Sequence, residues 1–407
     1  MHRPLIGVLA SSLLATGAVL AAQQAAQPPQ TTFKSGVDLI LIEATVLDKD
    51  GRPIADLQAK EFSIKIGGKA RTIAAAEYIP AGRATAAAPA PPAPGAPATS
   101  APASPDVALG IARAQLGASD RTIILAIDVD NIRSGAGRNA FVDVAEYVAT
   151  LPATDRIGIM TLPGGGTTVE PTADRAVVRE ALGRMAGADH RMNSCDATIG
   201  EAAAEAVNDD RGWDAFTKRA FPPHCRVKVE DPTHRDLKLF IPPYRAQAQQ
   251  TLGTLTSLTK NLGAVTGRRI IVLVSEGLYM DQDIIQNLPA FGAALERSRV
   301  ILYAIRLDFP YSEASAQYTG SATRLLDDRY GYDGMANAAA FGGGAAIRAI
   351  SRATPAITRI DQELSGTYLL GIERLPADAA GKTLEVRIEV TRKGTDVRTR
   401  RNITISK

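Results

Sequence analysis

Two apolar runs of strand length dominate the chain, and each ends abruptly at carboxylates. Residues 123–127 lead into Asp128 and Asp130, and residues 270–274 lead through a serine into Glu276. Apolar runs without alternation are typical of strands buried on both faces, as in a parallel sheet covered by helices. Ligands of such sheets bind just beyond the carboxyl ends of the strands. We therefore expect the acids of both strands to meet at one edge of the sheet, where a cation that prefers oxygen ligands could bind.

Between residues 106 and 365 the pattern alternates between strand-like and helix-like segments. Further strands are predicted over residues 156–162 and 300–305, and helices over residues 138–151, 174–185, 244–262, 283–297 and 348–364. Thr172 is the expected cap of the helix over residues 174–185. The alternation predicts an α/β fold with a doubly wound parallel sheet. A less regular insertion occupies residues 188–243.

Two β-rich segments flank this α/β domain. Residues 33–80 and residues 366–407 each carry short runs rich in Val, Ile and Leu, separated by turn residues. Each segment alone is too small to be stable, so we expect the two to pair into one composite β-sandwich. The tract at residues 81–105 is almost wholly Ala, Pro, Ser, Thr and Gly and is typical of an extended linker.

Composition and charge exclude several classes of function. A length of 407 residues favours two or three domains, and a net charge of +3 with 22% charged residues is too balanced to indicate nucleic-acid binding or a membrane surface. The nine Lys and Arg among residues 371–407 therefore favour a solvated charged face over a polyanion-binding strip.

The first residues have the order of a secretory signal. His2 and Arg3 precede an apolar stretch over residues 5–20, and small residues follow at a cleavage site after Ala21. An uncleaved membrane anchor is the alternative, but the apolar stretch is short for a span. We expect a signal peptide over residues 1–21, a disordered lead-in over 22–32, no later transmembrane segment, and export to a periplasm, cell envelope or the exterior.

Four segments resemble the von Willebrand factor type A domain, and more narrowly its divergent acidobacterial relatives. They are the opening FKSGVDLILIEATVLDKDGRPIADLQAKEF, the strand and loop TIILAIDVDNI, the strand GRRIIVLVSEGL, and the terminal GTYLLGIE followed by EVRIEVTRKGTDVRTRR. The resemblance implies a Rossmann-like domain flanked by β elements, in an exported protein.

The resemblance also implies a metal-ion-dependent adhesion site in a degenerate form. The first loop of ordinary type A domains reads Asp-x-Ser-x-Ser. Here Asp128 is retained, Asp130 replaces the first serine, and Ile132, which has no donor oxygen, replaces the second. Glu276 occupies the place of the third-loop aspartate.

The second-loop ligand and the identity of the ion stay open. Candidates for that ligand are Ser194, Asp196 and Thr198. Together with Asp128, Asp130 and Glu276, Ser194 completes a set of oxygen donors suited to Mg²⁺ or Ca²⁺. The alternative is that Asp128 and Asp130 cap the next helix or bond loop amides.

Both cysteines lie in the insertion. In an exported protein, Cys195 and Cys225 favour a disulfide, which would close a loop of about 30 residues and stabilise by roughly 3 kcal/mol. A zinc site with His190, His224 and His234 is the sharper alternative, although no close-paired ligand spacing supports it. Two free thiols are the third option.

The remaining motifs carry little chemistry. No His-Glu-x-x-His, nucleophile elbow or catalytic triad is present in the sequence, so an enzyme is not expected. The glycine runs at 164–166 and 342–344 indicate flexible loops, the pair at 327–328 a solvated loop, and Trp213 a local core anchor. The leading hypothesis is an exported, non-enzymatic protein-binding or adhesion-type module. A structural envelope protein with a vestigial metal site is the alternative, and a metal-dependent hydrolase with Glu276 as base is a weaker one.

Overall fold

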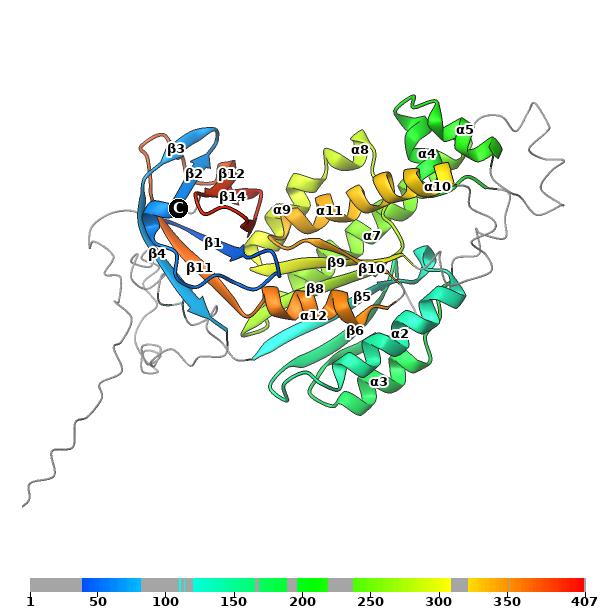
Figure 1. Ribbon diagram of the computed structural model, residues 1–407, viewed down its shortest axis with the longest axis horizontal. Helices are drawn as coiled ribbons and strands as arrows, with labels where there is room; N and C mark the ends of the chain where they lie inside the picture. Colours follow the sequence, from blue (N-terminus) through cyan, green and yellow to red (C-terminus); the bar gives the residue numbers. More distant parts are fainter. Residues whose placement is uncertain are drawn as a thin grey trace, which may run out of the picture. The chain divides into compact units, whose positions relative to one another are not determined.

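The computed structural model describes residues 39–81, 110, 113, 120–164, 168–188, 196–218, 237–308, 321–350 and 352–405 (Figure 1). All of them belong to one compact unit, Phe33–Lys407. The predicted signal peptide and lead-in, nearly all of the predicted linker, Ser194 and both cysteines lie outside the described residues.

A six-stranded, mostly parallel sheet forms the centre of this unit. Its strand order is β10-β9-β8-β5-β6-β7, and only β7 runs antiparallel to its neighbour. The strands are β5 (Arg121–Asp128), β6 (Arg156–Leu162), β7 (Thr168–Thr172), β8 (Arg268–Ser275), β9 (Val300–Asp308) and β10 (Ala346–Ile350). The α/β class that the alternating pattern predicts is confirmed.

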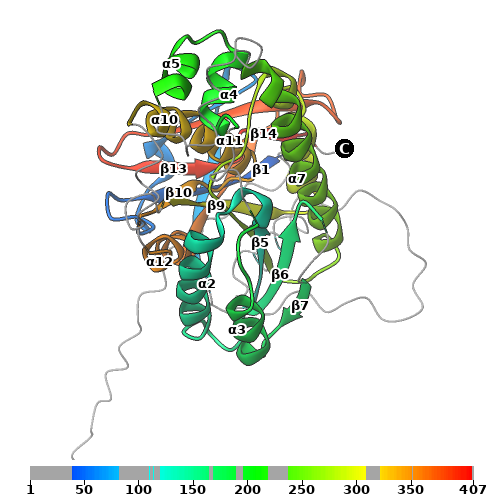
Figure 2. The same ribbon diagram turned by 90° about the vertical axis from the view of Figure 1, so that its right-hand side faces the viewer.

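Helices cover both faces of the sheet, which explains the continuous apolar runs. One face packs against α2 (Ser134–Val148), α3 (Arg175–Gly183) and α12 (Thr354–Glu363); the other packs against α7 (Ile241–Leu262), α9 (Leu288–Arg297) and α11 (Tyr332–Phe341). In Figure 2, α2 and α12 lie on one side of β5, and α7 lies on the other. Within β5, Ile123 and Leu125 belong to the first core, whereas Ile124 and Ala126 belong to the second. A strand buried on both faces is therefore apolar at successive positions along its centre.

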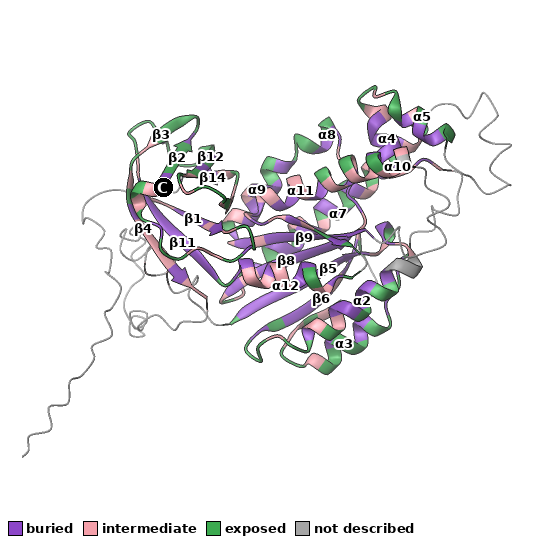
Figure 3. Ribbon diagram, in the orientation of Figure 1, coloured by how far each residue is buried: buried purple, intermediate pink, exposed green. Residues whose placement is uncertain are grey.

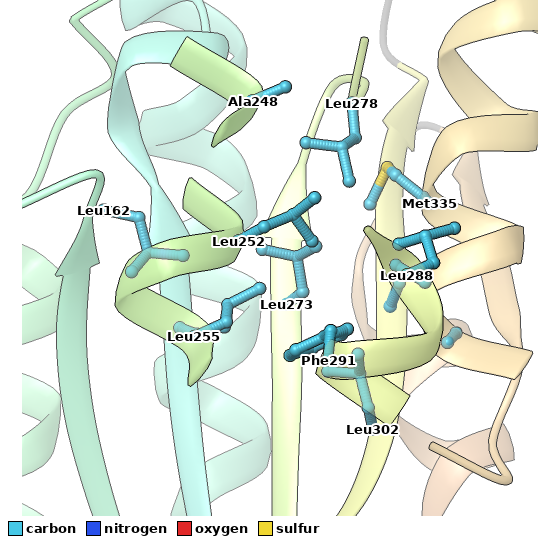
Figure 4. Close-up of a cluster of buried hydrophobic side chains, with 14 of the residues drawn as sticks. Leu162, Ala248, Leu252, Leu255, Leu273, Leu278, Leu288, Phe291, Leu302 and Met335 are labelled. Atoms are coloured by element: carbon cyan, nitrogen blue, oxygen red, sulfur yellow. The ribbon is translucent and has the colours of Figure 1, made fainter. Parts of the chain in front are cut away.

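Long aliphatic and aromatic side chains fill the second core. Leu273 of β8 lies between Leu255 of α7 and Phe291 of α9, with Met335 of α11 nearby (Figure 4). All four are at most 4% exposed. In a core of such fully buried side chains, the gain or loss of even one methylene group changes the stability of the protein.

Two four-stranded antiparallel sheets stand beside the α/β core, and each contains strands from both ends of the chain. Their orders are β13-β1-β11-β4 and β14-β12-β2-β3. The strands are β1 (Leu39–Leu47), β2 (Phe62–Ile66), β3 (Lys69–Arg71), β4 (Ile73–Pro80), β11 (Gly366–Glu373), β12 (Thr383–Val390), β13 (Asp396–Thr399) and β14 (Asn402–Thr404).

The two antiparallel sheets share one core, as the sequence predicts for a composite β-sandwich. Ile42 and Tyr368 contribute from one sheet, and Ile64 and Ile388 from the other. The inner positions of β2 are buried and the outer ones exposed, so this strand alternates, whereas β11 is buried along nearly its whole length and is purple in Figure 3. Because the outer positions of β2 are polar, its sequence alternates between apolar and polar residues, unlike the continuous apolar runs of the central sheet.

The charged C-terminal strip is a solvated face only in part, because Lys382, Arg387 and Lys393 are exposed whereas Arg398 and Arg400 contact the α/β core. Arg398 Nε lies 3.3 Å from Glu363 Oε2, and Arg400 Nη1 donates to the Val300 carbonyl at 3.0 Å. The backbone N–H of Thr404 donates to Glu296 Oε1 at 2.6 Å. These residues fasten the sandwich to α12, α9 and the beginning of β9.

Several predicted elements need correction. The predicted helix over 348–364 is a strand, β10, followed by α12, which begins at Thr354 with a proline in its first turn. The predicted helix over 283–297 is interrupted between α8 (Gln282–Ile285) and α9, which also begins with a proline. Asp174, not Thr172, caps α3, because its carboxylate accepts from the Ala176 and Val177 N–H groups.

The insertion is more ordered than its composition indicates. It contains α4 (Ile199–Ala206) and α5 (Arg211–Lys218), and α4 begins with a capping box between Thr198 and Glu201. Trp213 packs beside Phe216, with ring centroids 5.8 Å apart, in a small core of its own. Further along the chain, α10 (Ser321–Leu326) runs through a π-helical segment, Asp327–Gly331, into α11.

The glycines at 342–344 serve packing and not loop flexibility. A Cβ atom at Gly344 would lie 2.2 Å from the Leu302 carbonyl oxygen, and one at Gly342 would lie 2.5 Å from the Leu302 Cβ. The chain passes so close to β9 that only glycine fits.

Candidate functional site

The carboxyl ends of β5 and β8 meet through a buried carboxylate. Asp128 is fully buried at the last position of β5. Its Oδ2 accepts from Asn131 Nδ2 at 2.7 Å and from Ser275 Oγ, at the last position of β8, at 3.0 Å. These bonds fix the loop after β5 to the neighbouring strand. Asp128 therefore uses its side chain to hold a loop amide, one of the two roles that the sequence left open.

Glu276 lies directly above this contact and pairs with Arg133. Its Oε1 accepts from the Arg133 N–H at 2.9 Å, and its Oε2 accepts from Arg133 Nε at 2.6 Å. Its own N–H donates to the Asn131 carbonyl at 3.2 Å. The side chains of Arg133 and Glu276 are only 14% and 16% exposed, so charge-assisted bonds here are stronger than at an open surface. An arginine thus supplies the positive charge that the resemblance assigns to an ion.

The end of β9 adds a second ionic group. Arg306 Nε donates to the Glu276 carbonyl at 3.1 Å, and its Nη1 donates to Asp328 Oδ1 at 2.8 Å. Arg348 Nη2 reaches the same oxygen at 2.5 Å, and its Nε lies 3.5 Å from Asp308 Oδ2. Two arginines therefore converge on one aspartate.

Asp328 remains charged in this setting. Burial disfavours its ionised form, but hydrogen bonds from Arg348 and Arg306 outweigh burial and hold the pKa of its carboxyl below the usual value. Its neighbour Asp327 accepts from the Gly200 N–H at 2.7 Å. The solvated loop expected at residues 327–328 is wrong, because the pair lies in a π-helical segment whose carboxylates bind neighbouring elements. Such segments often occur at functional sites.

We call this surface the carboxyl rim. It comprises Asp130, Arg133, Glu276, Asp328 and Arg348, with Asp128, Ser275 and Arg306 buried beneath it. Asp130 is exposed in the one-turn helix after β5, Val129–Asn131. Of the residues expected there, the structure brings Asp128 and Glu276 together beside Asp130.

The three arginines were missed by sequence reasoning. Arg133 follows directly on the loop that the resemblance covers, so its position was a usable signal. Arg306 and Arg348 come from β9 and β10, and nothing in the local pattern links them to Asp328.

The candidate second-loop ligands do not share one role. Thr198 is committed to the start of α4, where its Oγ1 accepts from the Glu201 N–H at 3.3 Å. Asp196 is partly exposed just before it. Ser194 lies outside the described residues.

The donor set fits a divalent cation only in part. Asp128 and Asp130 are hard oxygen donors, but both oxygens of Glu276 already accept from Arg133, so an ion at Glu276 must displace that guanidinium. Within the described part of the chain, no group of three or more His, Cys, Asp or Glu side chains is placed to hold a metal ion.

No protein-family model and no curated protein matches this chain. The resemblance to type A domains therefore rests on the four segments quoted above. Over the residues that the structure describes, no helix is both long enough and apolar enough to cross a membrane.

Proposed function

We propose that the chain is an exported, non-enzymatic protein-binding module with a von Willebrand A-type, Rossmann-like α/β domain. The carboxyl rim is its contact surface. The observation that carries this proposal is the convergence of charged side chains from the ends of β5, β8, β9 and β10 on one edge of the sheet.

Preorganisation is the physical argument for recognition there. Side chains already held by paired hydrogen bonds lose little conformational entropy when a partner binds. Arg133 and Glu276 are held in this way, and Asp328 is held between two arginines. Alternating carboxylates and guanidinium groups also favour a partner of complementary charge pattern and disfavour others.

A site-specific crosslinking experiment tests the proposal. A photo-crosslinking amino acid replaces Asp130, on the carboxyl rim, or Lys65, an exposed residue of β2 in the sandwich. Each variant is expressed in the native cell and illuminated. A discrete adduct from position 130 and none from position 65 supports the rim. Equal adducts from both positions, or none at either position with the protein correctly folded, contradict it.

Calorimetry tests separately whether the carboxyl rim binds the divalent cation that the sequence predicts. Mg²⁺ or Ca²⁺ is titrated into the wild-type protein and into Asp130→Asn. A heat of binding that is seen with the wild-type protein and is absent with the variant supports a cation held by Asp128 and Asp130. If neither protein gives a heat of binding, the rim does not bind the cation, and its ion pairs alone would contact the partner. Repeating the crosslinking with a chelator shows whether capture needs the ion.

A further inference from the structure

A small cavity lies where the β-sandwich meets the amino ends of β8 and β9. It has a volume of about 20 Å³, and its wall includes the polar side chains of Glu43, Thr45, Arg268, Tyr303, Arg398 and Arg400. Glu43 and Thr45 belong to β1, Arg268 begins β8, and Arg398 belongs to β13. It is separate from the carboxyl rim, which lies at the other end of the same strands.

Arg268 is buried in this wall with an incomplete set of partners. The residue is 4% exposed. Its Nη1 donates to the Leu364 carbonyl, a neutral acceptor, and its Nε has no hydrogen-bond partner among the described residues. A guanidinium group stays charged in proteins, so its burial without a counter-charge is costly.

Arg400 is in a similar position. Its Nη1 donates to the Val300 carbonyl at 3.0 Å, which is again neutral. Burial lowers the pKa of both Arg268 and Arg400, and the charge of Glu43 opposes this in each case. Among the residues that the structure describes, no carboxylate forms an ion pair with either arginine.

Arg268 and Arg400 therefore lack a counter-charge in direct contact. Arg398 is balanced by Glu363 and Asp396, with Glu363 also paired to Arg359. The charge of Glu43 acts on both Arg268 and Arg400, and the charge of Glu296 acts on Arg400. Within the described residues neither carboxylate forms an ion pair with these two arginines.

The geometry points to a binding site for one small monovalent anion, of the size of chloride, between Arg268 and Arg400. Such an anion supplies the counter-charge in direct contact that both guanidinium groups lack. A cavity of about 20 Å³ exceeds the roughly 10–15 Å³ that a single water needs, but it excludes sulfate and phosphate. Because its wall includes both β1 and β8, the bound anion fastens the sandwich to the α/β core.

Thermal unfolding of the intact protein tests this site. The unfolding midpoint is measured in sodium chloride and in sodium gluconate at equal ionic strength, because gluconate is too large to enter. Chloride should raise the midpoint, by on the order of 2 °C for each tenfold rise in concentration above saturation. Crystals soaked in bromide should show an anomalous peak between Arg268 and Arg400.

Three variants of the cavity wall and one control variant separate chloride binding from general screening of charge. Arg268→Met and Arg400→Met should each lose the difference between the two salts. Glu43→Gln removes the competing charge and should tighten chloride binding about tenfold. Arg387→Met, at an exposed arginine of β12, should leave the difference unchanged.

The outcomes are decisive even where an arginine variant fails to fold. Equal midpoints for the wild-type protein in the two salts, with no bromide peak, overturn the proposal and assign the cavity to water. Glu43→Gln that destabilises the protein without increasing its response to chloride shows instead that Glu43 alone balances the arginines.

Discussion

Asp128, at the end of β5, and Asp130, in the loop after it, should differ in how much their substitution lowers the stability of the protein. Asp128 is fully buried and accepts two hydrogen bonds, whereas Asp130 is exposed. Hydrogen bonds to a charged group contribute about 1.5–3 kcal/mol each, and Asp128→Ala leaves two buried donors without an acceptor. Ser275 Oγ also lies 2.8 Å from the Gly277 carbonyl, so its hydroxyl can turn there and the loss is reduced. We expect Asp128→Ala to lower the free energy of unfolding by about 3 kcal/mol.

This loss translates into a measurable shift. About 3 kcal/mol corresponds to a fall of roughly 4 °C in the unfolding midpoint, because a unit of this size unfolds with a large entropy change. Asp130→Ala, as the matched control, should change stability by less than about 0.5 kcal/mol but should abolish partner capture at the carboxyl rim. Asp128→Asn keeps the shape and one acceptor, so its loss should be intermediate. Equal midpoints for Asp128→Ala and Asp130→Ala in calorimetry would refute the reasoning.

Three further substitutions test other parts of the structure. Gly344→Ala places a Cβ 2.2 Å from the Leu302 carbonyl oxygen and should destabilise by about 1–3 kcal/mol in chemical denaturation. Leu273→Ala, at a fully buried position (Figure 4), should cost about 2–5 kcal/mol with an unchanged denaturant slope. Burial raises the pKa of Tyr368 to about 12 from 10.0, so the stability it contributes is complete below pH 10.0 and is lost as the pH rises toward 12. Tyr368→Phe should reduce that alkaline loss and, by removing the acceptor of the Leu57 N–H, cost about 1 kcal/mol at neutral pH.

The central strands are the part of the fold that the sequence predicts best. β6 has the predicted bounds, and β5 contains the whole apolar run at residues 123–127, because burial on both faces favours an unbroken apolar run. β8 begins two residues before its apolar run, at Arg268. No local pattern indicates that a charged residue is buried, since its surroundings come from distant segments.

Short elements at the edge of the sheet were not predictable in the same way. β10 has apolar residues at spacings that suit a strand or the start of a helix, and a run of this length does not separate the two. β7 contains a proline, which pattern reasoning reads against a strand. Both strands lie at the sheet edges, where a strand needs fewer apolar positions.

The candidate site, like the fold, was predictable from the sequence only in part. The meeting of Asp128 with the end of β8 follows from a topological rule, since parallel strands end at a common edge. The partners of the carboxylates do not follow from it. Whether Glu276 faces an ion or Arg133 depends on side-chain geometry within a loop, and both choices satisfy the same requirement for positive charge.

The arrangement of the two β segments bears on how the carboxyl rim can work. At or beside the amino ends of β8 and β9, Val300 and Glu296 accept hydrogen bonds from Arg400 and Thr404 of the C-terminal β segment, and Arg268 donates to the Leu364 carbonyl just before β11. The rim lies at the carboxyl ends of the same strands, and eight residues of strand at 3.3 Å each separate the two by roughly 25 Å. Figure 1 shows the sandwich strands β1 and β11 at one end of the central sheet. Because the sandwich holds both ends of the described chain at that side, it leaves the opposite edge of the sheet to the loops that carry the charged side chains. A partner that binds there need not compete with the contacts that hold the fold together.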